Sequence, residues 1–259
     1  MEKTAMKKGQ VLHRKGEKVQ TVEVVLSGAL VMTDGDEVEV RLGSGTVAGA
    51  IYLPGEIYSF DYVAVEDSSL VTMEYQAAED VVEAVTSTPA IAPVMAAESM
   101  ALTKRMLDAL AATEEAAAEL CKEIKYNYND YQFLCVKLQT APTRFAFVEG
   151  MPVFEPSGMG LGWEAEMCRA YCEQEEELRE KFYPLDVHFC VETVMRASEV
   201  GQRVRKELEI VTTFIGQTRA ASAPFVAAFY DVKSRVDAKT RGASEETPTI
   251  SNALDVILA

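Results

Sequence analysis

The first part of the chain alternates hydrophobic and polar positions. From Gln10 to about Tyr75, β-branched residues alternate with polar ones in short runs such as VEVVLSGALVMT and DEVEVRL, and glycines separate the runs. A two-residue period with turn residues between the runs is typical of antiparallel strands. The Asp34-Gly35 pair predicts a hairpin because glycine accepts the positive φ of a tight turn. We therefore expect a compact β domain here.

After Ala77 the apolar residues change to helical spacing. Glycine almost disappears, and the new pattern predicts one long helix that starts near Pro89. Residues 140–163 hold three prolines and four glycines and are expected to form a loop. Helical patterns return over 164–181, 191–215 and 223–238. The long helix carries an apolar stripe made of Leu102, Met106, Leu110, Leu120, Ile124, Tyr128, Tyr131, Cys135 and Leu138.

Composition and charge narrow the class of protein. The 259 residues are 48% hydrophobic and carry 25 Lys and Arg against 41 Asp and Glu, a formal net charge of -16. Such a charge repels polyanions, so no nucleic acid partner is expected. No apolar run approaches the roughly 20 residues that cross a bilayer, and MEKTAMKKGQ lacks the apolar core of a signal peptide. We expect no membrane partner and a cytoplasmic location, where the five cysteines would be reduced thiols.

Two glycines bracket the segment LHRKGEKVQTVEVVLSGALVM. Gly16, followed by Glu17, opens it before an apolar strand over 22–26, and Gly28 closes it. Gly16 can make a turn that a residue with Cβ cannot, and Gly28 lets the next strand reverse direction closely against the first. The segment resembles the first signature of the cyclic-nucleotide-binding domain family, which includes the catabolite activator protein. The resemblance covers about the first 110 residues and implies a β-roll, similar in shape to a cupin jelly roll, followed by a dimerising helix.

These patterns predict an α+β fold with an N-terminal antiparallel β-roll followed by a mostly helical domain. We expect the roll over 1–90, a long connecting and dimerisation helix over 91–139, and a helical domain over 140–259. A small roll could not cover the whole apolar stripe, so a homodimer through the helix after Pro89 is expected. Ser251 is a good N-cap for a short apolar helix at the end, which would be marginal by itself. We therefore expect the native chain to continue past Ala259, unless this segment docks on the helical domain.

The resemblance also implies a phosphate-binding cassette after the first strands of the roll. In the family a Gly-Glu pair opens a short helix, and further along an Arg followed by a small hydroxyl residue holds the cyclic phosphate. Gly49 matches the glycine, and Ala50 stands at the position of the ribose-binding Glu. Phe60 and Asp61 occupy the Arg and hydroxyl positions. The cassette is therefore interpreted as degenerate.

The missing Arg decides the chemistry of this cassette. A buried phosphate gains about 1.5–3 kcal/mol from each charge-assisted hydrogen bond. No Arg or Lys occurs between Arg41 and Lys104, so no small shift of the alignment restores the contact, and Asp61 adds like charge. Cyclic nucleotide binding is therefore not expected, although a pocket for an uncharged or cationic ligand is an open alternative. The side chains expected to fill the pocket are Tyr52, Tyr58 or Phe60.

Other candidate side chains favour structural roles. Cys168 and Cys172 share a helical face, but no second pair has zinc spacing, and His13 is the only histidine of the β domain. His188 and Glu192 lie at i and i+4, which indicates a surface contact. No metal, cofactor or catalytic residue is expected.

Two further stretches leave alternatives. The aromatic stretch KYNYNDYQF and the loop around Trp163 could line a pocket, but we favour a helical core. Arg203, Arg205 and Lys206 could belong to a helix-turn-helix, but one continuous helix through 191–215 explains the apolar stripe better.

The sequence thus predicts a non-enzymatic sensory, regulatory or protein-interaction module for signal transduction, with a possible protein partner. The alternative is a transcription regulator of the catabolite activator type with a diverged DNA-binding region. A third hypothesis is a catalytic helical domain regulated by the roll, for which the sequence supplies no convincing residues.

Overall fold

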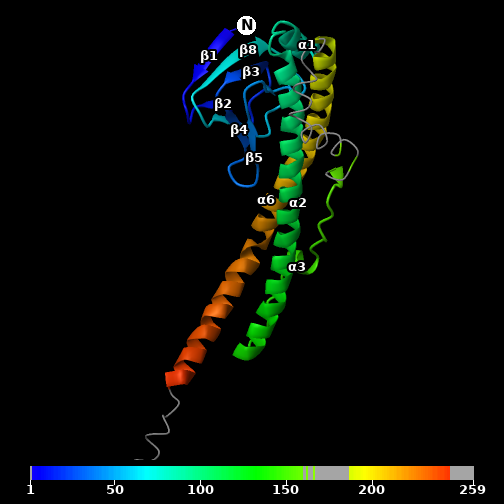
Figure 1. Cartoon of the computed structure of the whole chain (residues 1–259). Coiled ribbons are helices and arrows are strands. Elements are labelled where there is room, and N and C mark those ends of the chain that lie inside the picture. The colour runs from blue at the N-terminus through cyan, green and yellow to red at the C-terminus, as the bar shows by residue number, and fades with distance from the viewer. Residues whose placement is uncertain (1, 160–161, 163–165, 167–186, 246–259) are drawn as a thin grey trace, which may run out of the picture. The chain divides into compact units, whose positions relative to one another are not determined.

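The computed structural model describes residues 2–159, 162, 166 and 187–245, and it forms two compact units (Figure 1). We call Met1–Glu115 with Pro156–Thr213 the roll unit, and Ala116–Glu155 with Phe214–Ala259 the helix unit. Both units combine segments that are far apart in the sequence. The division into three successive segments that composition suggests stays a prediction.

The described part of the roll unit holds two four-stranded antiparallel sheets. Their strand orders are β1-β8-β3-β6 and β2-β7-β4-β5. A long helical region follows the sheets in the chain, which confirms the α+β class with an N-terminal β-roll. The strands are β1 (Glu2–Met6), β2 (Val11–His13), β3 (Thr21–Ser27), β4 (Leu30–Thr33), β5 (Glu39–Leu42), β6 (Val47–Ala48), β7 (Asp61–Ala64) and β8 (Ser68–Glu74).

Turn residues act in the roll as the sequence predicts. Gly16 and Gly28 have φ values of 93° and 81°, which disfavour a residue with Cβ. A Cβ on Gly28 would also lie 2.8 Å from Cα of Ser68, which explains the close reversal between β3 and β4. The hairpin at Asp34-Gly35 joins β4 to β5, and Oδ1 of Asp34 accepts the backbone N–H groups of the turn.

In the described part of the chain two long helices and two short ones follow the strands. They are α1 (Glu79–Thr86), α2 (Ala92–Leu138), α3 (Ala146–Glu149) and α6 (Val187–Glu245). The expected break between helices over 191–215 and 223–238 is wrong, because α6 continues through Pro224. A proline inside a helix costs about 3 kcal/mol. Phe225 and Phe229 are buried in the next turns, and their burial offsets this cost.

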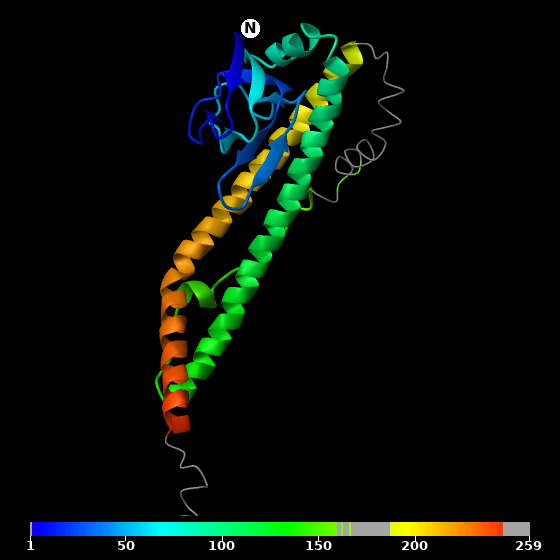
Figure 2. The ribbon, with the colours of Figure 1, turned by 60° about the vertical axis from the view of Figure 1, so that its left-hand side comes forward.

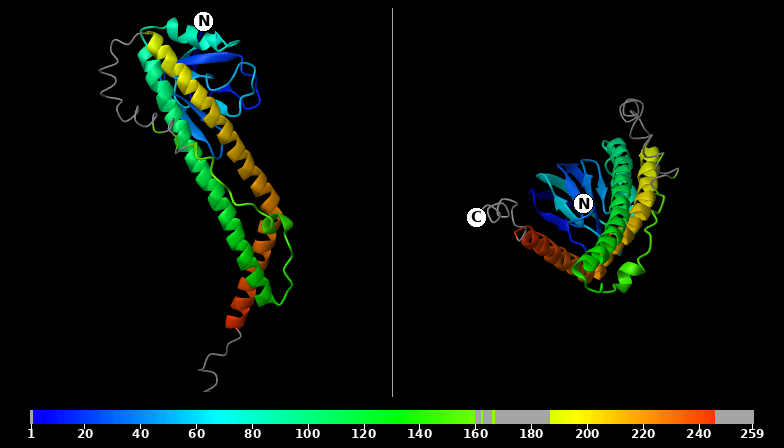
Figure 3. Two further views of the ribbon diagram at one scale, coloured as in Figure 1. Left: turned by 90° about the vertical axis from the view of Figure 1, so that its right-hand side faces the viewer. Right: turned by 90° about the horizontal axis from the view of Figure 1, so that it is seen from below.

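The first halves of α2 and α6 lie side by side in the roll unit (Figures 2 and 3). Oγ1 of Thr103 on α2 donates a hydrogen bond to the Ala197 carbonyl on α6 at 3.2 Å. Met106 and Leu110 of the apolar stripe are fully buried, and Val204 and Leu208 of α6 are buried as well. Within this unit the stripe is therefore covered by side chains of the same chain, and no second copy is needed to cover it.

Aromatic side chains form the core of the helix unit. Tyr128 and Tyr131 are buried, and both rings contact Phe225 edge-on at 5.6 and 6.0 Å. Tyr126 and Phe133 of the same stretch are exposed, so only the two middle aromatic residues of the stretch belong to the core. Trp163 lies outside the described residues. Among those residues, no helix has the length and apolar character that a membrane crossing requires.

Candidate ligand site at the cassette of the roll

The cassette segment, residues 49–61, leads from β6 to β7. Gly49 has a φ of 88°, and a Cβ there would lie 2.9 Å from the Thr21 carbonyl oxygen, so this turn requires glycine. The backbone N–H of Tyr52 donates to the Gly49 carbonyl at 3.0 Å. Turns fill this described segment, and the short helix that the resemblance implies is not formed there.

Side chains of the cassette fill the interior of the roll. Ala50, Tyr52, Tyr58 and Phe60 are all buried, and Tyr62 of β7 joins them. The ring centroids of Tyr52 and Tyr58 lie 4.9 Å apart, and those of Tyr58 and Tyr62 lie 5.5 Å apart, both edge to face. The side chains named as candidates for filling the pocket are therefore all buried, and the rings of Tyr52 and Tyr58 contact each other.

Asp61 is not directed at a free anion site. Its Oδ1 accepts the backbone N–H of Lys15 at 2.6 Å, at the turn that Gly16 makes. Phe60, at the position where the family places its Arg, is buried and offers no donor to a phosphate. The assignment of Gly49, Ala50, Phe60 and Asp61 to degenerate cassette positions stays a prediction.

A buried ionisable pair lies beside these rings. Nε2 of His13 lies 3.0 Å from Oε2 of Glu23, whose side chain is buried. The imidazole stacks on Tyr58, with centroids 4.3 Å apart and planes inclined by 13°. Sequence reasoning missed Glu23, although a carboxylate inside the apolar run of β3 was a signal. This carboxylate opposes the entry of a second anion.

Burial keeps the tyrosine phenols of the interior neutral. It raises the pKa of Tyr52 from 10.0 to about 12. It also raises the pKa of Tyr58, to which the Glu23 carboxylate adds, and it raises the pKa of Tyr62 well above its usual range. The phenols therefore act as packing and hydrogen-bonding groups at neutral pH.

These shifts predict a loss of stability at high pH. In the unfolded chain the phenols ionise near pH 10, whereas the Tyr52 phenol of the folded chain ionises near pH 12. The stabilising contribution is complete below pH 10 and is lost as the pH rises to about 12. We expect the thermal midpoint to fall over this interval. Parallel tyrosinate absorbance should show phenols that titrate only as the protein unfolds, and a midpoint unchanged up to pH 12 would contradict the assignment.

Arg205 of α6 contacts the cassette from a distant part of the chain. Its side chain is 3% exposed. Nε donates to the Ile51 carbonyl at 3.0 Å, and Nη1 donates to Oγ of Ser59 at 3.2 Å. Nη2 donates to Oε2 of Glu56 at 2.7 Å, and the guanidinium lies 4.2 Å from the centre of the Tyr52 ring. The cassette thus engages a cation that its own sequence lacks.

Two more residues of α6 continue this contact. A Cβ on Gly201 would lie 2.8 Å from Cγ2 of Ile51, so glycine permits the close approach of the helix. Oγ of Ser59 donates to Oε2 of Glu209 at 2.9 Å. Gly201, Arg205 and Glu209 are four residues apart and share one face of α6. Sequence reasoning considered Arg205 only for DNA contact, although its place beside the apolar Val204 and Leu208 was a signal of burial.

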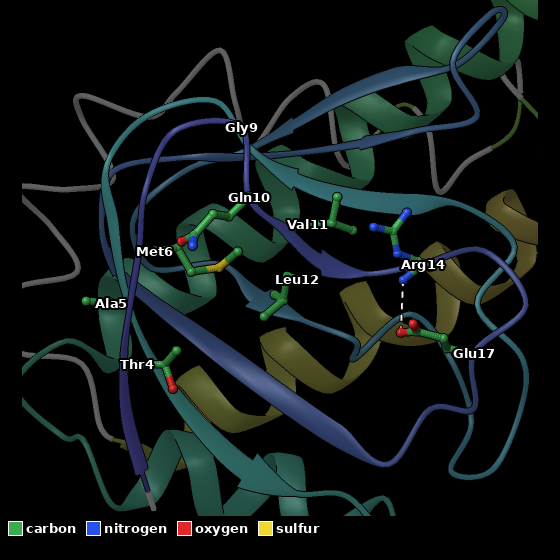
Figure 4. A pocket seen from close by; sticks show the side chains of 9 residues that line it. All are labelled: Thr4, Ala5, Met6, Gly9, Gln10, Val11, Leu12, Arg14 and Glu17. Atoms are coloured by element: carbon green, nitrogen blue, oxygen red, sulfur yellow. Dashed lines mark hydrogen bonds between the residues drawn. The ribbon is translucent and has the colours of Figure 1, made fainter.

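A pocket of about 510 Å³ opens between β1 and β2 (Figure 4). Thr4 and Met6 of β1 and Leu12 of β2 line it, and Arg14 and Glu17 lie at one end. The backbone N–H of Arg14 donates to the Glu17 carboxylate at 3.0 Å. None of its lining residues belongs to the cassette segment, although the Glu17 carbonyl accepts the backbone N–H of Tyr58 at 2.9 Å.

The remaining candidate residues of the sequence lie outside the cassette. Nε2 of His188 and Oε1 of Glu192 are 3.9 Å apart with both side chains exposed, which confirms a surface contact. The segment around Arg203 lies within the uninterrupted helix α6, as the preferred interpretation predicts. Cys168 and Cys172 lie outside the described residues.

Comparison with known proteins identifies the first third of the chain. Residues 3–84 match the family model of the cyclic nucleotide-binding domain. No curated protein matches the chain.

Several solved structures are similar to a part of this chain. An EAL enzyme in its cAMP-bound form is 20% identical with a TM-score of 0.28, and the match covers 32% of this chain and 24% of the enzyme. A putative cyclic nucleotide-binding protein from Geobacter metallireducens is 17% identical with a TM-score of 0.27, covering 36% of this chain and 69% of that chain. A transcriptional regulator from Thermotoga maritima is 13% identical with a TM-score of 0.28, covering 32% and 70%. The matched part therefore spans about a quarter of the EAL enzyme.

Proposed function

We propose that this chain is a non-enzymatic regulatory or protein-interaction module whose roll does not bind cyclic nucleotides. The proposal starts from the match of residues 3–84 to the cyclic nucleotide-binding domain family. The observation that carries the proposal is the occupied cassette. Tyr52, Tyr58 and Phe60 are buried, and the buried cation at the cassette, Arg205, is already paired with Glu56. Such a domain acts through the contacts of its surfaces and not through a bound nucleotide.

The charge balance of the interior supports this proposal. A cyclic phosphate needs a buried cationic partner, and residues 49–61 contain no Lys or Arg. The carboxylates of Glu23 and Glu56 lie at the interior and at the cassette, respectively. A phosphate that took Arg205 from Glu56 would leave this carboxylate beside the anion, with only the exposed Lys206, 3.8 Å away, as its cation. Binding would therefore require both a steric and an electrostatic rearrangement.

Thermal unfolding with nucleotides tests the proposal. A ligand at about 100 times its dissociation constant stabilises a fold by about 2.7 kcal/mol, which raises the midpoint by several degrees. We expect millimolar cyclic AMP and cyclic GMP to leave the midpoint unchanged, with the matching linear nucleotides as controls for ionic strength. A rise specific to a cyclic nucleotide, with saturable heat in calorimetric titration, would refute the proposed loss of binding.

The transcription-regulator alternative is less favoured. It would place a recognition helix near Arg203, Arg205 and Lys206. Arg205 is buried against the cassette and so is not available to a phosphate backbone, and the net charge of -16 opposes DNA. The regulatory proposal needs no basic surface.

Dimerisation through the helix after Pro89 stays a prediction, as do the cytoplasmic location and a protein partner. The apolar stripe that suggested a dimer packs within each unit on side chains of the same chain, as Met106 does in the roll unit and Tyr131 in the helix unit. Light scattering at micromolar concentration distinguishes a monomer of 28.4 kDa from a dimer of twice that mass.

A further inference from the structure

The contact between α6 and the cassette has the character of an interface between two surfaces. We call Gly201, Arg205 and Glu209 the docking face of α6, and the cassette side consists of Ile51, Tyr52, Glu56 and Ser59. Every partner on the cassette side is more than 140 residues from Arg205 in the sequence. The contact is thus made entirely by docking and not by local chain connection.

The docking face is polar, unlike the interface around it. Elsewhere α6 packs through Val194, Val204 and Leu208, which are fully buried and apolar. On the docking face a buried guanidinium is satisfied by one carbonyl, one hydroxyl and one carboxylate. A buried ion pair adds little net stability compared with apolar residues, but it specifies one geometry. When a polar contact of this kind opens, its charged and polar groups form hydrogen bonds with water. When an apolar contact opens, hydrocarbon surface is exposed to water, which is unfavourable.

We propose that the docking face is a latch, through which α6 reversibly releases the cassette while the two β-sheets stay folded. The latch rests on the proposed function, because it describes how access to the occupied cassette of a regulatory module would be controlled. Release exposes Ile51, Ser59 and the Tyr52 ring, which the docked helix covers. The docking face and the cassette both belong to the roll unit, so the release is a change within that unit.

Thiol labelling distinguishes local release from global unfolding. The Ile51→Cys variant places a thiol under the docking face, and Leu70→Cys places one in strand β8, both at buried positions. Peptide mass spectrometry separates each introduced thiol from the five native cysteines. We expect labelling at Ile51→Cys to exceed that at Leu70→Cys by tenfold or more under native conditions. Equal rates would show that the docking face opens only when the sheets unfold, and would overturn the latch.

Variants on α6 test whether Arg205 controls the release. Arg205→Gln in the Ile51→Cys background should raise the labelling rate about tenfold, corresponding to about 1.4 kcal/mol, and labelling at Ile51→Cys should still exceed that at Leu70→Cys measured with the same substitution. Arg196→Gln is the matched control, because it removes the same charge from an exposed position of α6. An unchanged rate at Ile51→Cys, equal rates at the two positions, or the same increase with Arg196→Gln would show that Arg205 does not control the release.

An engineered disulfide tests the latch by a third experiment, which does not depend on Arg205. A Cβ on Gly201 would lie 3.6 Å from Cβ of Ile51, within the range of disulfides. In the double variant Ile51→Cys/Gly201→Cys we expect oxidation to form this bond and to slow amide exchange over 51–59, with β3 and β8 unchanged. Exchange that is equally slow before and after oxidation would contradict the latch. Nucleotide-dependent thermal shifts test the loss of binding separately, so either proposal can fail without the other.

Discussion

Replacing Arg205 with alanine lowers the free energy of unfolding of the roll unit by about 3 kcal/mol, the lower end of the range for breaking a buried ion pair. The substitution leaves the Glu56 carboxylate, which is 27% exposed, without its main cation. It also removes the donors to the Ile51 carbonyl and to Ser59. Partial solvation of Glu56 is the reason for taking the lower end of the range.

Thermal unfolding followed through the near-ultraviolet circular dichroism of the buried tyrosines reports on the roll unit through Tyr52, Tyr58 and Tyr62 and on the helix unit through Tyr128 and Tyr131. A loss of about 3 kcal/mol corresponds to a midpoint lower by about 6–12 °C. Arg205→Lys should lie between the wild type and Arg205→Ala, because lysine keeps the charge but cannot satisfy three acceptors in one plane. Arg196→Ala, exposed on the same helix, should change the free energy by less than about 0.5 kcal/mol. A loss below about 1 kcal/mol for Arg205→Ala would show that the contact is largely open in solution.

Gly28→Ala is expected to destabilise the roll unit by about 3 kcal/mol. This value adds the cost of a left-handed backbone at a residue with Cβ to the cost of the steric clash that the Cβ makes. Gly28 has a φ of 81°, and its added Cβ would lie 2.8 Å from Cα of Ser68. That neighbour is backbone, so the β3–β4 turn must move away from β8. The movement would also break the hydrogen bond in which the Ala29 N–H donates to Oγ of Ser68.

Gly16→Ala is the matched control for this substitution. Gly16 has a φ of 93° but no atom within 4 Å of an added Cβ. It therefore carries only the conformational penalty of about 1–2 kcal/mol. Denaturant unfolding of both variants isolates the steric part as their difference. Equal losses would mean that the turn at Gly28 relaxes without cost, contrary to the close approach in the structure.

Local pattern was sufficient for the elements of the roll. Alternation, the Asp34-Gly35 turn and the two bracketing glycines each depend on a few neighbouring residues, and the structure contains the corresponding strands and turns. The prediction of a separate last helix over 223–238 was wrong, because α6 continues through Pro224. Burial of Phe225 against Tyr128 and Tyr131 keeps the helix continuous there, and this contact spans distant segments.

The sequence by itself determined that the cassette lacks a cation, because the absence of Lys and Arg between Arg41 and Lys104 needs no coordinates. It also identified the aromatic side chains that could fill the interior. Only the tertiary structure decided that Arg205 meets the cassette, 154 residues from Ile51. The pairing depends on how α6 packs against the roll, on the space left at Gly201 and on the direction of one guanidinium. Such a contact is the sum of many weak packing terms along a whole helix, and no short stretch of sequence contains that sum.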